Sequence, residues 1–164
     1  IPGCGKTTFC NYLKQGKISV LDLAKANNAI LLGNSKEETV EIDLEKLNKS
    51  LKLDWKESPS ENLFIDGHLS HNLPVDCVIL FRCRPDILEE RLRRRKWSEE
   101  KISENVECEL LSILINEIDK GISTLEVDTT NKKISETWDE VNEWLNGNRK
   151  TRMLQIDWIA ELHS

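Results

Sequence analysis

The chain has 164 residues and a formal net charge of −6, and charged side chains make up 32% of it. This length is sufficient for one α/β domain with a single core. The acidic balance argues against a protein that wraps DNA or RNA non-specifically, because such binding needs a strongly basic surface. A small polar or phosphorylated ligand fits the composition better.

The cysteines and the hydropathy indicate the compartment. The five cysteines show neither a CxxC pair nor a zinc-ligand spacing, and their number is odd; they are Cys4, Cys10, Cys77, Cys83 and Cys108. We therefore interpret them as reduced, mostly core-packed thiols and expect a cytoplasmic protein. No apolar run approaches the length of a membrane span, so no membrane partner is expected.

The chain opens with a phosphate-binding motif. Most of the Walker A pattern GxxxxGK(S/T) is present in Gly3-Cys4-Gly5-Lys6-Thr7-Thr8. In this motif the backbone N–H groups surround a phosphate at the start of a helix. Lys6 would reach the β- and γ-phosphate oxygens, the hydroxyl of Thr7 would coordinate Mg²⁺, and Thr8 would support the same cradle. The alternative is an ordinary Gly-Pro turn before a helix.

The motif also predicts its surroundings. Its first glycine would lie one residue before Ile1, and a phosphate-binding loop follows a buried parallel strand. We therefore expect an apolar strand upstream of this sequence. The helix that opens on the loop is expected over residues 6–15, before Gly16.

Short strands and helices alternate along the chain. Before residue 67 we expect a strand at 17–21, a helix at 22–28, a loop at 33–40, a short strand at 39–42, a helix with Leu44, Leu47 and Leu51 on one face, and a buried strand at 63–66. Asp22 and Asp43 are the expected N-caps.

Beyond residue 67 we expect strands at 77–81 and 125–128 and helices at 86–96, 98–118, 135–147 and 152–163. Ser98 and Ser135 are the expected N-caps, and Trp158 is expected to anchor the last helix in the core rather than to stack on a base. The alternation predicts a parallel sheet with right-handed crossovers.

Asp66 ends the apolar run at 63–66 and precedes Gly67-His68. Ligands collect at the carboxyl ends of parallel strands, so Asp66 is a candidate for holding Mg²⁺ or its water shell, with a turn aspartate as the alternative. His68 is a candidate proton carrier or water-orienting group, or a structural histidine. His68 and His71 lack a third zinc ligand.

Arginines are concentrated in one segment. Six of the eight lie between positions 82 and 95: Arg82, Arg84, Arg91, Arg93, Arg94 and Arg95. The dipole of the helix at 86–96 explains one or two of them. The cluster therefore predicts an anionic partner, which is either the phosphates of a donor and an acceptor or those of RNA.

Together these motifs resemble the atypical adenylate kinase/ATPase family, which is shared by archaea and the eukaryotic nucleus and assists small ribosomal subunit maturation. The resemblance runs from residue 1 to about 145 and rests on Gly3 to Thr8, Asp22-Leu23-Ala24, Asp66-Gly67-His68, Leu80-Phe81-Arg82, Arg91-Leu92 with Arg95, and Glu104 to Glu109. Lys96 and Trp97 depart from it, since a Gly-Tyr pair is common there.

The resemblance implies a fold. It is a single P-loop kinase-like α/β domain over residues 1–164, with a parallel β-sheet flanked by helices on both faces. A small segment at about 19–42 would bind the nucleoside monophosphate, and a short lid would cover about 94–104.

The resemblance also implies ATP and Mg²⁺ as ligands and AMP as acceptor. Lys6, Arg82, Arg91 and Arg95 would stabilise the transferring phosphoryl group, Asp66 would organise Mg²⁺, and Lys132 would lie near the adenine. The residues leave other functions open. The protein could be an assembly factor that hydrolyses ATP to leave a ribosomal protein or pre-rRNA, with His68 positioning the water; a kinase for shikimate, gluconate or another small metabolite; or a non-catalytic nucleotide-binding module.

Overall fold

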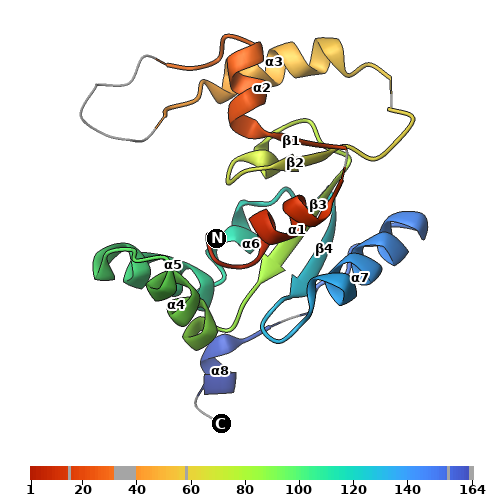
Figure 1. The fold of residues 1–164 in the computed structure, drawn as a ribbon. Helices are drawn as coiled ribbons and strands as arrows, with labels where there is room; N and C mark the ends of the chain where they lie inside the picture. Colours follow the sequence, from red (N-terminus) through yellow and green to blue (C-terminus); the bar gives the residue numbers. More distant parts are fainter. Residues whose placement is uncertain (15, 32–39, 58, 155, 163–164) are drawn as a thin grey trace. The chain divides into compact units, whose positions relative to one another are not determined.

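A computed structural model describes residues 1–162 except 15, 32–39, 58 and 155. The chain forms two compact units. The first unit joins Ile1–Tyr12 to Asp76–Ser164, and the second unit is Leu13–Val75. Each unit contains one pair of parallel strands with helices around it (Figure 1). No helix in the described part of the chain is both long and apolar enough to cross a bilayer.

The second unit is built on strands β1 (Lys17–Ser19) and β2 (Phe64–Asp66), which pair in parallel. Helices α2 (Val20–Ala26) and α3 (Leu44–Asp54) supply most of its core, and a short 3₁₀ helix, η1 (Ser70–Asn72), follows β2. The core consists of Val20, Leu23, Ala24, Ala29, Leu47, Leu51 and Leu73. The apolar face expected for α3 is therefore the buried one.

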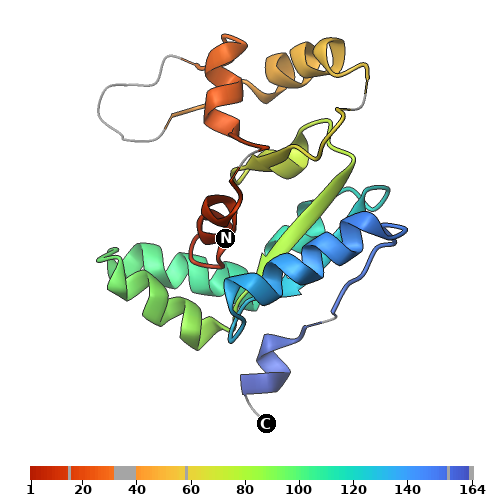
Figure 2. The same cartoon turned by 45° about the vertical axis from the view of Figure 1, so that its right-hand side comes forward.

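The first unit is built on strands β3 (Cys77–Arg82) and β4 (Ser123–Asp128), which pair in parallel over their whole length. Its helices are α1 (Lys6–Tyr12), α4 (Pro85–Arg94), α5 (Glu99–Leu110), α6 (Ile113–Glu117), α7 (Ile134–Asn146) and α8 (Trp158–Leu162). In both views α4 and α5 lie side by side (Figure 1 and Figure 2).

Helices cover both faces of this strand pair. Phe81 and Arg82 are neighbours on β3 and so point to opposite faces. Phe81 packs on Phe9 of α1, with ring centroids 5.2 Å apart, and Phe9 also contacts Trp138 of α7. On the other face Arg82 pairs with Glu109 of α5. The predicted fold class, parallel strands with flanking helices, is confirmed.

The Arg82 face holds a buried ion cluster. The Arg82 side chain donates from Nε to Glu109, at 2.6 Å, and from a terminal nitrogen to Glu126 on β4. Its other terminal nitrogen donates to the carbonyl of Glu109 and to the hydroxyl of Ser112. The guanidinium also lies 5.8 Å from the ring centre of Trp158. All three charged residues are at most 2% exposed, so their polar atoms are satisfied by protein partners and not by water.

Two predicted helix starts were wrong. Ser19, not Asp22, caps α2: its hydroxyl accepts from the Asp22 N–H at 3.0 Å, so Asp22 lies in the first turn and the preceding strand ends earlier than predicted. In α7 the N-cap is Lys133 instead of Ser135, because Glu136 accepts from the Lys133 N–H at 2.7 Å and draws that residue into the cap. The predicted caps Asp43 and Ser98 are confirmed.

The predicted helix over 98–118 is broken. It ends at Leu110, and α6 begins at Ile113 after Ser112, whose φ of +53° is left-handed. The Ser112 hydroxyl accepts from the buried Arg82 at 2.9 Å. This tertiary hydrogen bond accompanies the break, and the spacing of apolar residues along the helix could not have predicted it.

The described residues before Trp158 in the C-terminal segment are not helical, so the predicted helix over 152–163 is too long. Arg152 pairs with Leu125 of β4 as a parallel bridge, and only Trp158–Leu162 is helical among the residues described there. Trp158 is 2% exposed, which confirms it as a core anchor. The expected loop at 33–40 lies, apart from its last residue, outside the described residues, and Ile42 forms an isolated antiparallel bridge with Ile30.

The ion cluster makes a stability prediction. Replacing Arg82 by Ala leaves two buried carboxylates without their cation, so we expect the free energy of unfolding to fall by roughly 3–5 kcal/mol in urea titrations. Arg84→Ala is the matched control, since Arg84 pairs with Asp86 at the surface. Its loss of stability should be much smaller, because a solvent-exposed ion pair contributes little. Equal losses in the two variants would contradict this account of the cluster.

Candidate phosphate-binding site

The glycine loop, defined as residues 3–8, has the backbone that its sequence predicts. Gly3 and Gly5 have φ angles of +92° and +96°, in the left-handed region that favours glycine. A Cβ on Gly3 would also lie 2.5 Å from the Leu88 side chain of α4. The first backbone hydrogen bond of α1 runs from Phe9 N to Gly5 O, at 2.9 Å. The N–H groups of residues 5–8 therefore precede the helical ladder and can receive an anion.

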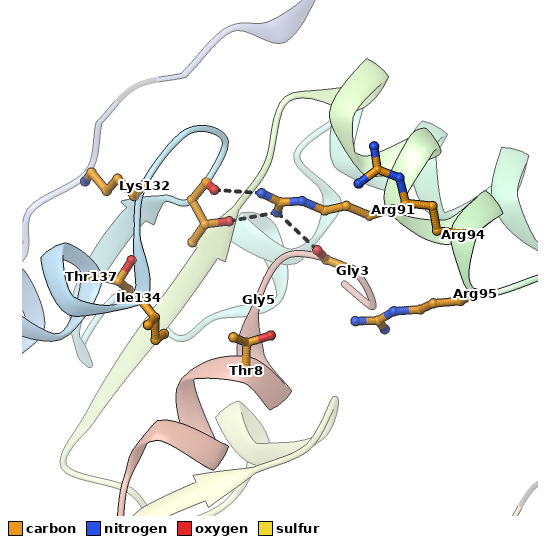
Figure 3. Close-up of a pocket in the computed structure, with 10 residues that line it drawn as sticks. Gly3, Gly5, Thr8, Arg91, Arg94, Arg95, Lys132, Ile134 and Thr137 are labelled. Carbon is orange, nitrogen blue, oxygen red and sulfur yellow. Dashed lines mark hydrogen bonds between the residues drawn. The ribbon is translucent and has the colours of Figure 1, made fainter.

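Arg91 of α4 fixes the loop to the segment that follows β4. Its guanidinium donates to the carbonyls of Gly3 and Thr129 at 3.3 and 2.9 Å (Figure 3). It also donates to the carbonyl of Thr130 at 3.1 Å. The Thr129 hydroxyl in turn lies 3.0 Å from the carbonyl of Cys4. The loop is thus held from two directions before any ligand binds.

These residues form one side of a pocket of about 390 Å³ in the first unit. It is lined by Gly3, Gly5, Thr8, Arg91, Arg94, Arg95, Thr129, Lys132, Ile134 and Thr137. Figure 3 shows the Arg95 side chain pointing toward the glycine loop, with Lys132, Ile134 and Thr137 on the far side. The pocket brings together the loop, the end of α4 and the start of α7, which are far apart in the sequence.

The arginine cluster divides into paired and free side chains. Arg82 and Arg91 are engaged as described above, and Arg84 pairs with Asp86. Arg93 pairs with Glu89 and Glu99, and Arg94 pairs with Glu90. Within the described part of the chain, the Arg95 side chain makes no ion pair or hydrogen bond. Arg95 therefore brings uncompensated positive charge to the pocket.

The buried position of Arg82 weakens its predicted role. Its side chain is 2% exposed, and Nε and both terminal nitrogens donate to protein oxygens. A guanidinium engaged in this way cannot also neutralise a transferring phosphoryl group without leaving buried carboxylates unpaired. Arg82 is also not among the residues that line the pocket.

Three other predicted ligand residues lie in or near the pocket. Lys6 donates from Nζ to the carbonyl of Ile1 at 3.4 Å, so its ammonium folds back over the start of the chain. Thr7 is exposed beside it. Lys132 lines the pocket, but its ammonium is paired with Glu140.

The two cysteines around the loop are unreactive by environment. Burial raises the pKa of the Cys4 thiol well above its usual range, and the Glu109 carboxylate adds to this shift. Burial also raises the pKa of Cys83 to about 11. Both side chains therefore stay protonated at neutral pH and act as packing groups, not as nucleophiles.

Asp66 and His68 belong to the second unit. Asp66 ends β2 opposite Ser19, as the apolar run predicted, and is half-buried. A Cβ on the following Gly67 would lie 2.6 Å from Val20, so the turn requires glycine there. His68 is exposed. The cooperation of Asp66 and His68 with the glycine loop stays a prediction.

Sequence reasoning missed several residues of the site, Ile134 among them. Thr129 and Thr137 line the pocket, and Glu109 lies behind the loop. Thr129 was detectable, since it directly follows a buried strand at the end where ligands gather. Glu109 ends one of the motifs that carry the family resemblance, but nothing in that motif assigned it a place behind the loop. Thr137 lies inside a helix and carries no comparable signal.

Comparison with known proteins places this site in a family. Residues 1–112 match the model of a family described as "AAA domain". Three archaeal proteins named "Putative adenylate kinase" are similar over nearly the whole chain. They come from Thermococcus onnurineus (36% identical, covering 98% of this chain and 88% of that protein), Pyrococcus abyssi (38%, 96% and 87%) and Methanocaldococcus jannaschii (36%, 98% and 90%).

The match includes all of α5 as well as the glycine loop and the arginine segment, which line one side of the pocket. The identity exceeds 30% over most of each chain. The protein therefore belongs to the AAA-domain family of P-loop proteins and to the adenylate kinase-like group within it.

Proposed function

We propose that this protein transfers a phosphoryl group from ATP to a nucleoside monophosphate, with AMP as the acceptor. The observation that carries the proposal is the position of Arg95, whose uncompensated guanidinium faces the glycine loop across the pocket. An anion-binding loop and a free arginine on opposite sides suit a phosphate chain between them. The relatives named "Putative adenylate kinase" support AMP as the acceptor.

The chemistry needs positioning and charge neutralisation, and no nucleophile on the protein. An oxygen of the acceptor phosphate attacks the γ-phosphorus in line, the bond from that phosphorus to the β–γ bridging oxygen breaks, and ADP leaves. The protein's task is therefore to hold both groups and to stabilise the negative charge on the transferring oxygens. The amides of the glycine loop and Lys6 would hold the β- and γ-phosphates. Arg95 would neutralise the transferring group, while Arg91 keeps the loop in place.

The far side of the pocket suits a nucleobase. Ile134 contributes an apolar surface and Thr137 a hydroxyl, and both lie at the start of α7. Lys132 extends from the same segment, with its ammonium held by Glu140. An adenine placed there would leave its phosphates directed toward the loop.

The oxygen donors predicted for Mg²⁺ fit a hard cation. Thr7 offers a hydroxyl and Asp66 a carboxylate, the ligand types that Mg²⁺ prefers. The described residues include no group of three or more His, Cys, Asp or Glu that could hold a metal. Mg²⁺ usually takes several of its oxygens from phosphates and water, and it would supply charge neutralisation when bound.

ATP hydrolysis linked to a ribosomal protein or pre-rRNA is the finer alternative from the family resemblance. Binding to RNA would use the basic surface predicted at the arginine cluster. The free positive charge there is smaller than predicted, because Arg93 and Arg94 are paired with glutamates. The segment at 19–42 and the lid at 94–104 remain the proposed acceptor-binding and closing parts. We place nucleotide kinase activity first.

The first prediction concerns the acceptor. Full-length protein is incubated with Mg²⁺ and ATP and with AMP, CMP or no acceptor, and ADP is measured with a coupled assay. We expect AMP to give the fastest ADP formation. ADP formation that is unchanged by AMP would reject the kinase and favour hydrolysis, whereas turnover only with another small metabolite would reassign the acceptor.

The second prediction concerns Arg95. We expect Arg95→Ala to lower kcat for ADP formation by about 10²–10³-fold, the effect of removing one group that stabilises transition-state charge. Arg93→Ala is the matched control, because Arg93 carries the same charge two residues away and pairs with Glu89 and Glu99 outside the pocket. Its kcat should stay within about twofold of the wild type. Similar losses of kcat in both variants would show that the total positive charge of the segment matters, and not the position of Arg95 in the pocket.

A further inference from the structure

The side of the glycine loop that faces the protein interior contacts a buried carboxylate. Gly3 and Gly5 line the pocket, but Cys4 between them is 0% exposed. Its thiol points to Oε2 of Glu109, with a sulfur–oxygen distance of 3.8 Å. Glu109 lies in the last turn of α5 and is 1% exposed. A charged group thus lies directly behind the proposed phosphate-binding backbone.

The Glu109 carboxylate is itself held tightly. Its Oε1 accepts from Nε of Arg82 at 2.6 Å, from Cys83 N at 3.2 Å and from Nε1 of Trp158 at 2.9 Å. These three donors come from β3, the residue after it and α8. A carboxylate fixed by three donors offers its other oxygen in one place, so the Cys4 side chain has a rigid acceptor.

We propose that Glu109 is a positioning residue for the glycine loop and acts on nucleotide binding through Cys4. This inference rests on the proposed function, since it assigns the loop to ATP. Backbone donors bind phosphate productively only when they are held within about 0.5 Å of the required geometry. Glu109 fixes the loop from the interior, as Arg91 does from α4 and Thr129 from the segment that follows β4.

Glu126 offers a matched control. It pairs with the same arginine and is 0% exposed, but its second oxygen accepts from Leu154 N in the C-terminal segment instead of facing the loop. Glu109→Gln and Glu126→Gln therefore remove the same charge from the same buried cluster. Only the first changes the acceptor that Cys4 contacts.

The experiment compares these two variants with the wild type in full-length protein. The KM for ATP and kcat are measured at saturating AMP, thermal melting reports stability, and iodoacetamide labelling of Cys4 without nucleotide is followed by peptide mass spectrometry. For Glu109→Gln we expect the KM for ATP to rise about five- to tenfold and Cys4 to be labelled about tenfold faster. For Glu126→Gln we expect both values within about twofold of the wild type, with a lower melting temperature.

A double variant tests the route through Cys4. If Glu109 acts through this side chain, Cys4→Ala/Glu109→Gln should raise the KM for ATP no further than the larger of the two single changes. An additive rise would overturn that route.

Two results would overturn the proposal as a whole. One is an equal rise of KM and of Cys4 labelling in both glutamine variants, which would make the effect a general loss of stability. The other is a Glu109→Gln protein with unchanged KM and unchanged labelling. A wild-type protein without AMP-dependent turnover would instead reject the proposed function, and the labelling rates would still decide whether Glu109 holds the loop.

Discussion

The buried pairing of Arg82 with Glu109 and Glu126 is the constraint on which the first unit depends. One guanidinium reaches α5 through Glu109 and β4 through Glu126, and these carboxylates accept from Trp158 and from Leu154 N. Arginine suits this position because its planar fork presents several donors at fixed angles. A buried charge must be compensated locally, so the cluster specifies how these segments pack together.

The glycine loop inherits its geometry from this cluster and from α4. Its carbonyls accept from Arg91 and Thr129, and its buried Cys4 side chain faces Glu109. The loop's own backbone hydrogen bonds begin only at Phe9. Neighbouring side chains thus provide the rigidity that the loop lacks, and its amides remain available for a ligand. A rigid loop with free amides suits an enzyme whose main task is to position its substrates.

The arginine segment was recognised from the sequence, but the separate roles of its arginines were not. The concentration of six arginines in an acidic chain correctly drew attention to residues 82–95, but it suggested one shared partner. The structure gives them different tasks: Arg82 stabilises the core, Arg91 supports the loop, and Arg95 faces the pocket. The carboxylates that bind Arg82 lie 27 and 44 residues away in the sequence. Local patterns cannot reveal such partners.

The sequence by itself determined the parallel strands, most helices and the glycine loop, because these follow from hydrophobic periodicity, capping and the conformational freedom of glycine, all of which act between near neighbours. Only the tertiary structure decided where the helix at 98–118 breaks, which arginine stays free, and that Glu109 lies behind the loop. Those outcomes depend on which buried charges meet, and that is fixed by the packing of segments far apart in the chain.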